Sequence, residues 1–128
     1  MLTRDQILSS NDLPSEPVAV PEWGGTVHVR TMSGTDRDAF EQSMLDARTK
    51  GEPNLINIRA RLAVKTVANA DGERLFSDQD AEALGRKSAR ALDRVFAVAQ
   101  RLNGIGEKEA KELAGNSEAG PTGDSTSS

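Results

Sequence analysis

The strongest hydrophobic pattern in the chain lies between Arg86 and Asn103. Apolar residues recur there every three or four positions, which is the spacing of an amphipathic α-helix. Asn103-Gly104 closes the pattern with a typical C-terminal stop, because glycine adopts the left-handed conformation without strain. We therefore predict a helix over 87–103. Its apolar face comprises Ser88, Leu92, Val95, Phe96, Ala99 and Leu102, and its opposite side carries a basic stripe of Arg90, Arg94 and Arg101.

Two further segments follow the helical spacing and predict main helices over 34–49 and 54–68. The first begins after Ser33, a favoured N-cap residue, and has a narrow apolar face. The second has a wider apolar face, so we expect it to lie centrally. Shorter helices are predicted near residues 5–9, after Ser77 and over 107–113, the first two from capping signals. The expected core positions of the two main helices are Phe40, Met44, Ala47, Ile56, Ala60, Ala63, Val64 and Val67.

Residues 18–30 alternate between apolar and polar positions on both sides of Gly24-Gly25. This alternation around a glycine turn is typical of a β-hairpin. Pro17 and Pro21 lack the backbone N–H that a central strand needs, so we expect the first strand at a sheet edge. The predicted fold class is mainly α, a small helical domain of about three main helices with an N-terminal β-hairpin as a minor α+β part and a disordered C-terminal tail.

The chain of 128 residues is long enough for one domain with a modest core. From Ala114 onward its residues are small, polar or helix-breaking, and they cannot bury enough apolar area to offset the entropy of ordering. We therefore predict a domain over 1–113 and a disordered polar tail over 114–128. No apolar run has the length of a signal peptide or a membrane span, which predicts a soluble cytoplasmic protein with no membrane partner.

The sequence offers little support for catalysis. It contains no Cys and one His, which excludes thiolate chemistry and Cys-ligated metals. The local sequence around His28 supplies no nucleophile or carboxylate to work with it, so we interpret His28 as an ordinary strand residue. The start of a calcium-binding loop is resembled by the spacing of Asp78, Asp80 and Glu82. The central Gly and the late Glu of such a loop are missing, so we interpret these acids as helix-capping residues. We predict no enzyme, no catalytic residue, no metal, no cofactor and no small-molecule substrate.

Four residues are candidates for binding a partner. Trp23 precedes a glycine pair that lacks the Lys and Ser/Thr of a phosphate loop, and it either packs on the hairpin or is an exposed interface anchor. The basic stripe of Arg90, Arg94 and Arg101 either docks on an acidic partner or a phosphate backbone, or is a solvated face. In the second case acids such as Glu107, Glu109 and Glu112 partly neutralise it. The net charge of −4 argues against general nucleic-acid binding.

The order of several segments resembles a known family. These segments are PEWGG followed by TVHVR, the block DGERLFSDQDAEALG and the helix ALDRVFAVAQRLNG. With the polar tail they resemble, over residues 2–113, the tail assembly chaperones of long-tailed, siphovirus-type bacteriophages. The resemblance implies a non-enzymatic assembly factor that binds and solubilises the tape measure protein during tail morphogenesis in the host cytoplasm. It also implies tail tube subunits as further partners, absence from the mature virion and production in two lengths by ribosomal frameshifting, with self-association as a further option.

Two alternatives remain open from the sequence. The chain could be a minor virion or connector protein, which its presence in purified mature particles would favour. It could also be a small helical DNA-binding regulator that uses the basic stripe on phosphates, with the Leu84-Gly85 break as the turn before its recognition helix. Salt-dependent binding to random-sequence DNA would favour that second alternative.

Overall fold

The computed structural model describes residues 1–51 and 57–105. Its helices are α1 (Arg4–Leu8), α2 (Gly34–Thr49), α3 (Ile58–Thr66), α4 (Ala81–Gly85) and α5 (Ala89–Leu102). Its strands are β1 (Ser15–Val20), β2 (Gly25–Arg30) and β3 (Val67–Ala68), and two 3₁₀ turns, η1 and η2, span Pro21–Trp23 and Asp78–Asp80. For the described residues, the predicted class is confirmed: mainly α, with an N-terminal hairpin.

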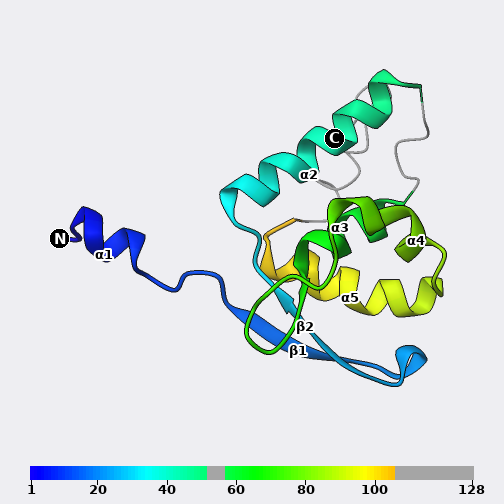
Figure 1. Ribbon diagram of the computed structural model, residues 1–128, viewed down its shortest axis with the longest axis horizontal. Coiled ribbons are helices and arrows are strands. Elements are labelled where there is room, and N and C mark those ends of the chain that lie inside the picture. The colour runs from blue at the N-terminus through cyan, green and yellow to red at the C-terminus, as the bar shows by residue number, and fades with distance from the viewer. Residues whose placement is uncertain (52–56, 106–128) are drawn as a thin grey trace, which may run out of the picture.

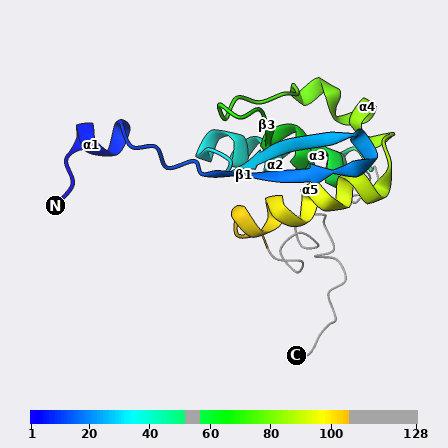
Figure 2. The ribbon, with the colours of Figure 1, turned by 90° about the horizontal axis from the view of Figure 1, so that it is seen from below.

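The helices pack against one small sheet, and α1 projects from this body (Figure 1). The sheet has the order β1-β2-β3, with both neighbouring pairs antiparallel. Helix α5 lies along the sheet and contacts β1 and β2 (Figure 2). Helix α3 contacts α2, α4 and α5. The central position predicted for this segment from its wide apolar face is therefore confirmed.

The hairpin follows the two-residue period of its sequence. Val18 and Val20 of β1 share a face with Val29 of β2, and all three side chains are buried in the core. The turn differs from the predicted glycine pair, because η1 precedes it and only Gly24 has a positive φ, of 78°. Gly25 already belongs to β2. Strand β1 lies at the sheet edge, as its prolines predicted.

The helix predicted over 54–68 is wrong at its C-terminal end. Helix α3 ends at Thr66, and Val67–Ala68 form β3, which pairs with His28 and Val29 of β2. Val67 has an extended backbone, with φ −75° and ψ 129°. Val67 is β-branched, and such residues pack well on a pleated sheet. Its position in the sequence therefore fits the apolar spacing of a helix, although the residue lies in a strand. Residues 54–56, with the predicted cap Asn54 and core residue Ile56, lie outside the described residues.

Helix α2 has the predicted bounds, and its apolar face of Phe40, Met44 and Ala47 is buried. Helix α5 begins two residues later than predicted because Ser88 is its N-cap: the Ser88 hydroxyl accepts the Ala91 N–H at 3.0 Å. Ser88 is therefore a capping residue rather than part of the apolar face. The buried residues of α5 are Ala91, Leu92, Val95 and Ala99, with Phe96 and Leu102 partly buried beside them.

Contacts at two places fix the ends of the helices. The Asn103 side-chain oxygen accepts the Met32 N–H at 2.6 Å, and Arg37 donates to the Asn103 carbonyl at 2.9 Å, so the end of α5 is tied to the start of α2. Gly85, at the end of α4, lies so close to Asn57 that a Cβ there would be 2.2 Å from the Asn57 side-chain oxygen. The Leu84-Gly85 break thus permits close packing of α4 on α3.

The predicted helix over 107–113 and the tail over 114–128 lie outside the described residues.

Candidate partner-binding surface

Two of the three residues of the basic stripe on α5 pair with acids of the hairpin, at a surface that remains open to solvent. Arg94 donates two hydrogen bonds to the Glu22 carboxylate, from Nε at 2.8 Å and from Nη2 at 3.1 Å. Arg101 forms an ion pair with Glu16 of β1. Both acids lie on the β1–η1 segment, 72 and 85 residues from their partners in the sequence. The hairpin therefore supplies its own acidic partners to two of the three stripe residues.

The Glu22–Arg94 pair also shifts the titration of both groups. The hydrogen bond from Arg94 lowers the pKa of Glu22, with a smaller contribution from the charge of Arg90. The same hydrogen bond raises the pKa of Arg94. The bidentate geometry is the strongest form of arginine–carboxylate pairing, but both groups are in contact with solvent. We conclude that this pair fixes the hairpin tip on α5 while remaining accessible to a competing acid.

Arg90 and Trp23 are the candidates that stay available. Arg90 is exposed, and its side chain forms no hydrogen bond or ion pair within 1–51 and 57–105. Trp23 is partly buried and packs against the core, so it packs on the body and also keeps one part of its indole in solvent. The structure brings Trp23 next to the stripe through its neighbour Glu22, whose carboxylate binds Arg94. Arg101 is tied instead to the opposite end of the hairpin, through Glu16.

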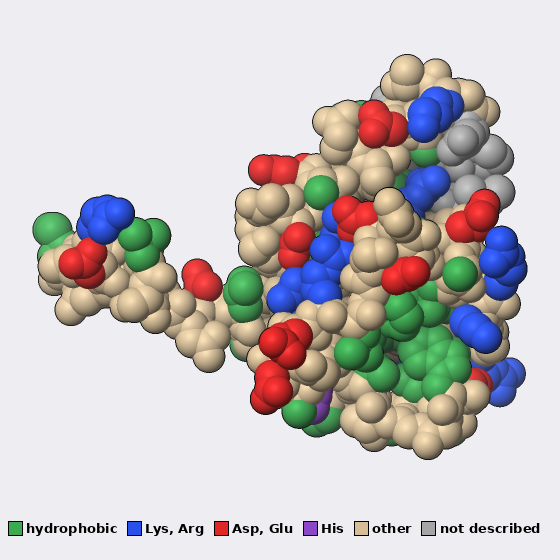
Figure 3. All heavy atoms as spheres, viewed as in Figure 1, with side chains coloured by type: hydrophobic (Ala, Val, Ile, Leu, Met, Phe, Trp, Pro, Cys, Tyr) green, Lys and Arg blue, Asp and Glu red, His purple; other side chains and the backbone are tan. Residues whose placement is uncertain are grey.

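Hydrophobic side chains gather on one face of the molecule, between α4, the loop of residues 69–77 and the hairpin (Figure 3). Of the partly buried apolar residues that pack against the core, Trp23 and Val27 belong to η1 and β2 of the hairpin, and Phe76 belongs to the 69–77 loop. We call these three residues the apolar patch. Lys and Arg side chains lie beside the hydrophobic area at the margin of the same view. This face therefore brings apolar and basic side chains close together at the surface.

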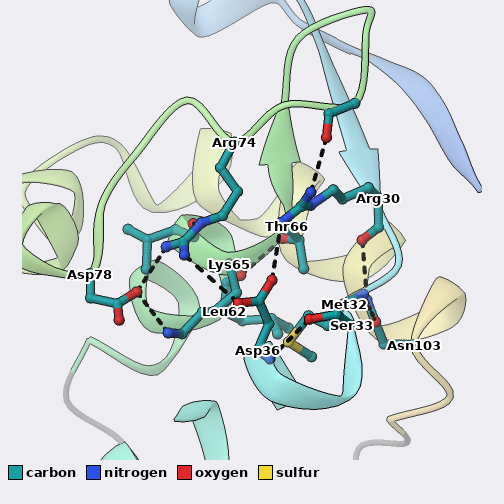
Figure 4. Close-up of polar contacts among 12 residues, drawn as sticks. Arg30, Met32, Ser33, Asp36, Leu62, Lys65, Thr66, Arg74, Asp78 and Asn103 are labelled. Atoms are coloured by element: carbon teal, nitrogen blue, oxygen red, sulfur yellow. Dashed lines mark hydrogen bonds and ion pairs between the residues drawn. The ribbon is translucent and has the colours of Figure 1, made fainter. Parts of the chain in front are cut away.

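A second charged group lies deeper in the body, where it links α2, α3, β2 and the loop before α4 (Figure 4). We call it the inner charge cluster; its members are Arg30, Asp36, Lys65, Arg74 and Asp78. Arg30 donates to Asp36 at 3.0 Å, and Asp78 Oδ1 accepts from Lys65 at 2.7 Å and from Arg74 at 2.8 Å. These hydrogen bonds lower the pKa of Asp78, with the one from Lys65 contributing most.

The inner charge cluster has the features of a structural element. The Lys65 side chain is only 6% exposed, and Arg74 also donates to the Val64 carbonyl at 2.8 Å. Arg30 donates to the Gly72 carbonyl at 3.0 Å, which fastens the 69–77 loop to β2. The hollow beside Lys65 and Asp78 has a volume of about 80 Å³, far below the several hundred Å³ of an ordinary ligand pocket. The cluster therefore holds the loop in place and leaves little room for a substrate.

The remaining candidates for chemistry gain no support from the geometry. His28 faces Pro17 on β1 and Ala68 on β3, and neither of these residues carries a functional group. Asp80 accepts the Ser77 N–H at 2.8 Å in a capping box, as the capping interpretation predicted. In the described part of the chain, no group of three His, Cys, Asp or Glu residues could hold a metal ion. No helix within it is long and apolar enough to cross a membrane.

The sequence missed the acids that neutralise the stripe. Its candidates lay near residues 107–112, outside the described residues, whereas the structure uses Glu16 and Glu22. One signal was present: Glu16 lies two residues before Val18 in β1, so the strand period places it on the face that packs against α5. No comparable signal existed for Glu22, because a turn residue has no fixed face.

Comparisons with known proteins agree with the sequence resemblance. The family model described as phage tail assembly chaperone matches residues 4–115. Among solved structures, the chain is similar to the tail assembly chaperone of bacteriophage HK97, with 19% sequence identity and a TM-score of 0.58, over 77% of this chain and 94% of that one. At this identity the structural likeness shows a shared fold. No curated protein matches the sequence.

Proposed function

The chain belongs to the phage tail assembly chaperone family, and we propose that it binds the tape measure protein and keeps it soluble until the tail tube forms around it. A tape measure protein exposes long stretches of apolar and charged helical surface before it is enclosed. Such surface aggregates when it is left uncovered. Many weak contacts from an abundant small domain cover it reversibly, because multivalency supplies the total strength. Tail tube subunits then displace the chaperone.

The observation that carries this proposal is the family match over residues 4–115. The binding face we propose comprises the exposed guanidinium of Arg90 and the apolar patch, which includes the Trp23 indole. Arg94 and Arg101 join this face only when an acidic segment of the partner replaces Glu22 or Glu16. The partner segment that fits is a helix with an apolar side and neighbouring acidic residues.

Co-expression with the tape measure protein tests the proposal. We expect soluble tape measure protein with the wild-type chain, a complex on gel filtration, and loss of both with Arg90→Glu combined with Trp23→Ala. Lys50→Glu, an exposed reversal just after α2, is the matched control for net charge and should behave as wild type. If the tape measure protein is equally soluble alone and no complex survives cross-linking, the chaperone proposal fails. If the complex withstands Arg90→Glu and Trp23→Ala, the function holds and the proposed face is wrong.

We further propose that the protein is not an enzyme, acts in the host cytoplasm, is absent from the mature virion and is made in two lengths by ribosomal frameshifting. Mass spectrometry of infected cells would show the second length as a product that shares residues 1–113 and differs at its C-terminal end. The same method on purified particles separates this proposal from a minor virion or connector protein. A DNA-binding regulator is disfavoured because the chain's own acids occupy Arg94 and Arg101.

A further inference from the structure

Asn103 joins the end of α5 to the segment between β2 and α2, and both polar atoms of its side chain are used. Its side-chain oxygen accepts the Met32 N–H at 2.6 Å, and its side-chain nitrogen donates to the Arg30 carbonyl at 3.5 Å (Figure 4). The same nitrogen donates to the Ala99 carbonyl at 2.9 Å, and Arg37 donates to the Asn103 carbonyl at 2.9 Å. An ionised carboxylate could not replace this amide, because it accepts hydrogen bonds but donates none.

The residue after Asn103 is Gly104, and this is the single Asn-Gly pair of the chain. Such a pair is chemically labile in water, because the glycine backbone nitrogen attacks the side-chain carbonyl carbon of the Asn. The new C–N bond closes a five-membered succinimide ring, and the amide nitrogen leaves as ammonia with the proton of the glycine N–H. Water then opens the ring to Asp or isoaspartate, so water is the only co-reactant. Glycine favours the attack because no Cβ obstructs the approach.

The folded chain holds this pair in a geometry that does not react. Ring closure needs the Gly104 nitrogen on the same side of the Cα–C bond as the Asn103 side chain. The Asn103 ψ of 5° places it beside the Asn103 backbone nitrogen instead. The Gly104 N–H is directed to the Arg101 carbonyl at 3.4 Å, and the Ile105 N–H donates to the Gln100 carbonyl at 2.9 Å. Ile105 is 3% exposed and belongs to the core, so it holds this last turn of α5 in place.

We propose that Asn103 is a deamidation site that reacts only when the last turn of α5 opens, and that the reaction makes the opening irreversible. The product carries a carboxylate where the amide nitrogen donates to Ala99 and Arg30, so two carbonyl oxygens lose their donor and face a negative charge. In isoaspartate the backbone also runs through the side chain, which lengthens it and removes the cap geometry. A chain whose α5 has opened is thus chemically marked. The proposal concerns the chain alone and does not depend on what the protein binds during tail assembly.

Peptide mass spectrometry on the full chain tests the site, because trypsin releases residues 102–108 as one peptide. At mildly alkaline pH we expect Asn103 to deamidate at least tenfold more slowly in the folded chain than in urea, since only the open fraction reacts. In urea, Gly104→Ala should slow the reaction at least tenfold, which identifies the attacking nitrogen. Asn11, an exposed Asn followed by Asp12, is the internal comparison and should react at one slow rate in both conditions. Equal rates at Asn103 in the folded chain and in urea would overturn the proposal.

Variants separate opening of the α5 end from unfolding of the whole domain. Ile105→Ala removes the side chain that holds the last turn, and Arg37→Ala removes the bond to the Asn103 carbonyl. Each should speed deamidation of the folded chain at least fivefold well below its thermal midpoint. Val20→Ala, a buried change in the hairpin, is the control and should alter the rate less than twofold.

The consequence of the reaction is tested with Asn103→Asp, which reproduces one product. It should lower the thermal midpoint clearly more than Asn11→Asp, which adds the same charge at an exposed position. Equal acceleration of deamidation by Val20→Ala and Ile105→Ala would show that global unfolding controls the reaction and would overturn the local gate. An Asn103→Asp chain as stable as wild type would overturn the claim that the reaction is irreversible for the fold.

Discussion

Two charged regions of this small domain differ in how far their side chains are exposed to solvent. The stripe pairs, Arg94 with Glu22 and Arg101 with Glu16, join α5 to the hairpin at the surface, and the exposed fractions of their side chains range from 22% to 61%. The inner charge cluster includes Arg30 and Asp36, which are 15% and 19% exposed, and Lys65, which is 6% exposed. Burial therefore separates Arg30, Asp36 and Lys65 from the stripe pairs, whereas Arg74 and Asp78, at 25% and 62% exposed, form the solvent edge of the inner charge cluster.

That difference decides which region stabilises the fold and which one is free to exchange partners. Removing one member of a surface pair leaves the other member in water at little cost. Removing an acid from the inner charge cluster leaves a buried cation without a counter-ion, which costs much more. The Nε of Arg30 is buried and has no hydrogen-bond partner among the described residues, so Arg30 relies on few contacts. We therefore assign stability to the cluster and partner exchange to the stripe.

The largest effect is expected from Asp36→Ala. This change removes the carboxylate that accepts from Arg30 at 3.0 Å and lies 3.9 Å from Arg74. We expect the free energy of unfolding to fall by about 2–3 kcal/mol, because the partly buried Arg30 guanidinium loses its acid and Arg74 keeps only Asp78. Urea unfolding followed by circular dichroism measures it. Asp38→Ala, an exposed acid two residues further along α2, is the control and should change little; equal losses would show that the cluster adds no special stability.

A smaller, pH-dependent effect is expected at Asp78. Its pKa in the folded state lies below the ordinary value of 3.8, because Lys65 and Arg74 donate hydrogen bonds to the carboxylate. A depressed folded pKa stabilises the fold above the unfolded pKa, and this contribution is lost as the pH falls through the folded pKa. Asp78→Asn should therefore cost about 1 kcal/mol at pH 6, a figure discounted because the Asp78 side chain is 62% exposed.

The difference between Asp78→Asn and wild type should be constant from pH 5 to 7 and shrink below about pH 4. Thermal or urea unfolding at each pH measures it. Asp71→Asn, an exposed acid in the same loop, controls for the change in net charge. A gap between Asp78→Asn and wild type that grows toward low pH would contradict the assigned direction of the pKa shift.

The success of the sequence predictions depended on how local their signals were. Helix α2 was placed correctly because Ser33 and the spacing of Phe40, Met44 and Ala47 lie within one segment. The capping box at Ser77 and the stop at Gly104 are equally local. β3 could not be found, because Val67–Ala68 become a strand only through pairing with β2. A two-residue strand carries no period of its own.

The candidate site was predicted only in part for the same reason. Helical spacing placed Arg90, Arg94 and Arg101 on one side of α5, but it could not show that Glu16 and Glu22 return from the other end of the chain. Lys65 was invisible as a buried charge, because lysine in a helix normally faces solvent and its partner Asp78 comes 13 residues later. Contacts across such separations are set by tertiary packing, which single-sequence patterns do not contain.

Salt should separate the two regions without large changes in stability. The double variant Glu16→Gln, Glu22→Gln removes both acids of the stripe pairs, which are screened because they are in contact with solvent. We expect its small loss of thermal midpoint at 50 mM NaCl to disappear at 1 M. The loss caused by Asp36→Ala should persist at both concentrations, because buried groups are screened much less. If both losses disappear together in high salt, the distinction by burial is wrong.

The smallest effect is expected from exchanging the charges of one stripe pair. Arg94→Glu alone places two acids in contact at the hairpin tip, and Glu22→Arg alone adds a third guanidinium beside Arg90 and Arg94, so each should lower the thermal midpoint slightly. The double variant Glu22→Arg, Arg94→Glu restores an opposite-charge pair and should recover most of the midpoint, which a double-mutant cycle measures. The same double variant reverses the charge that α5 carries at position 94 of the proposed binding face, while the hairpin stays packed on α5. Tape measure binding that is lost in this folded double variant would identify the charge of Arg94 as part of the contact, whereas retained binding would restrict the face to Trp23 and Arg90.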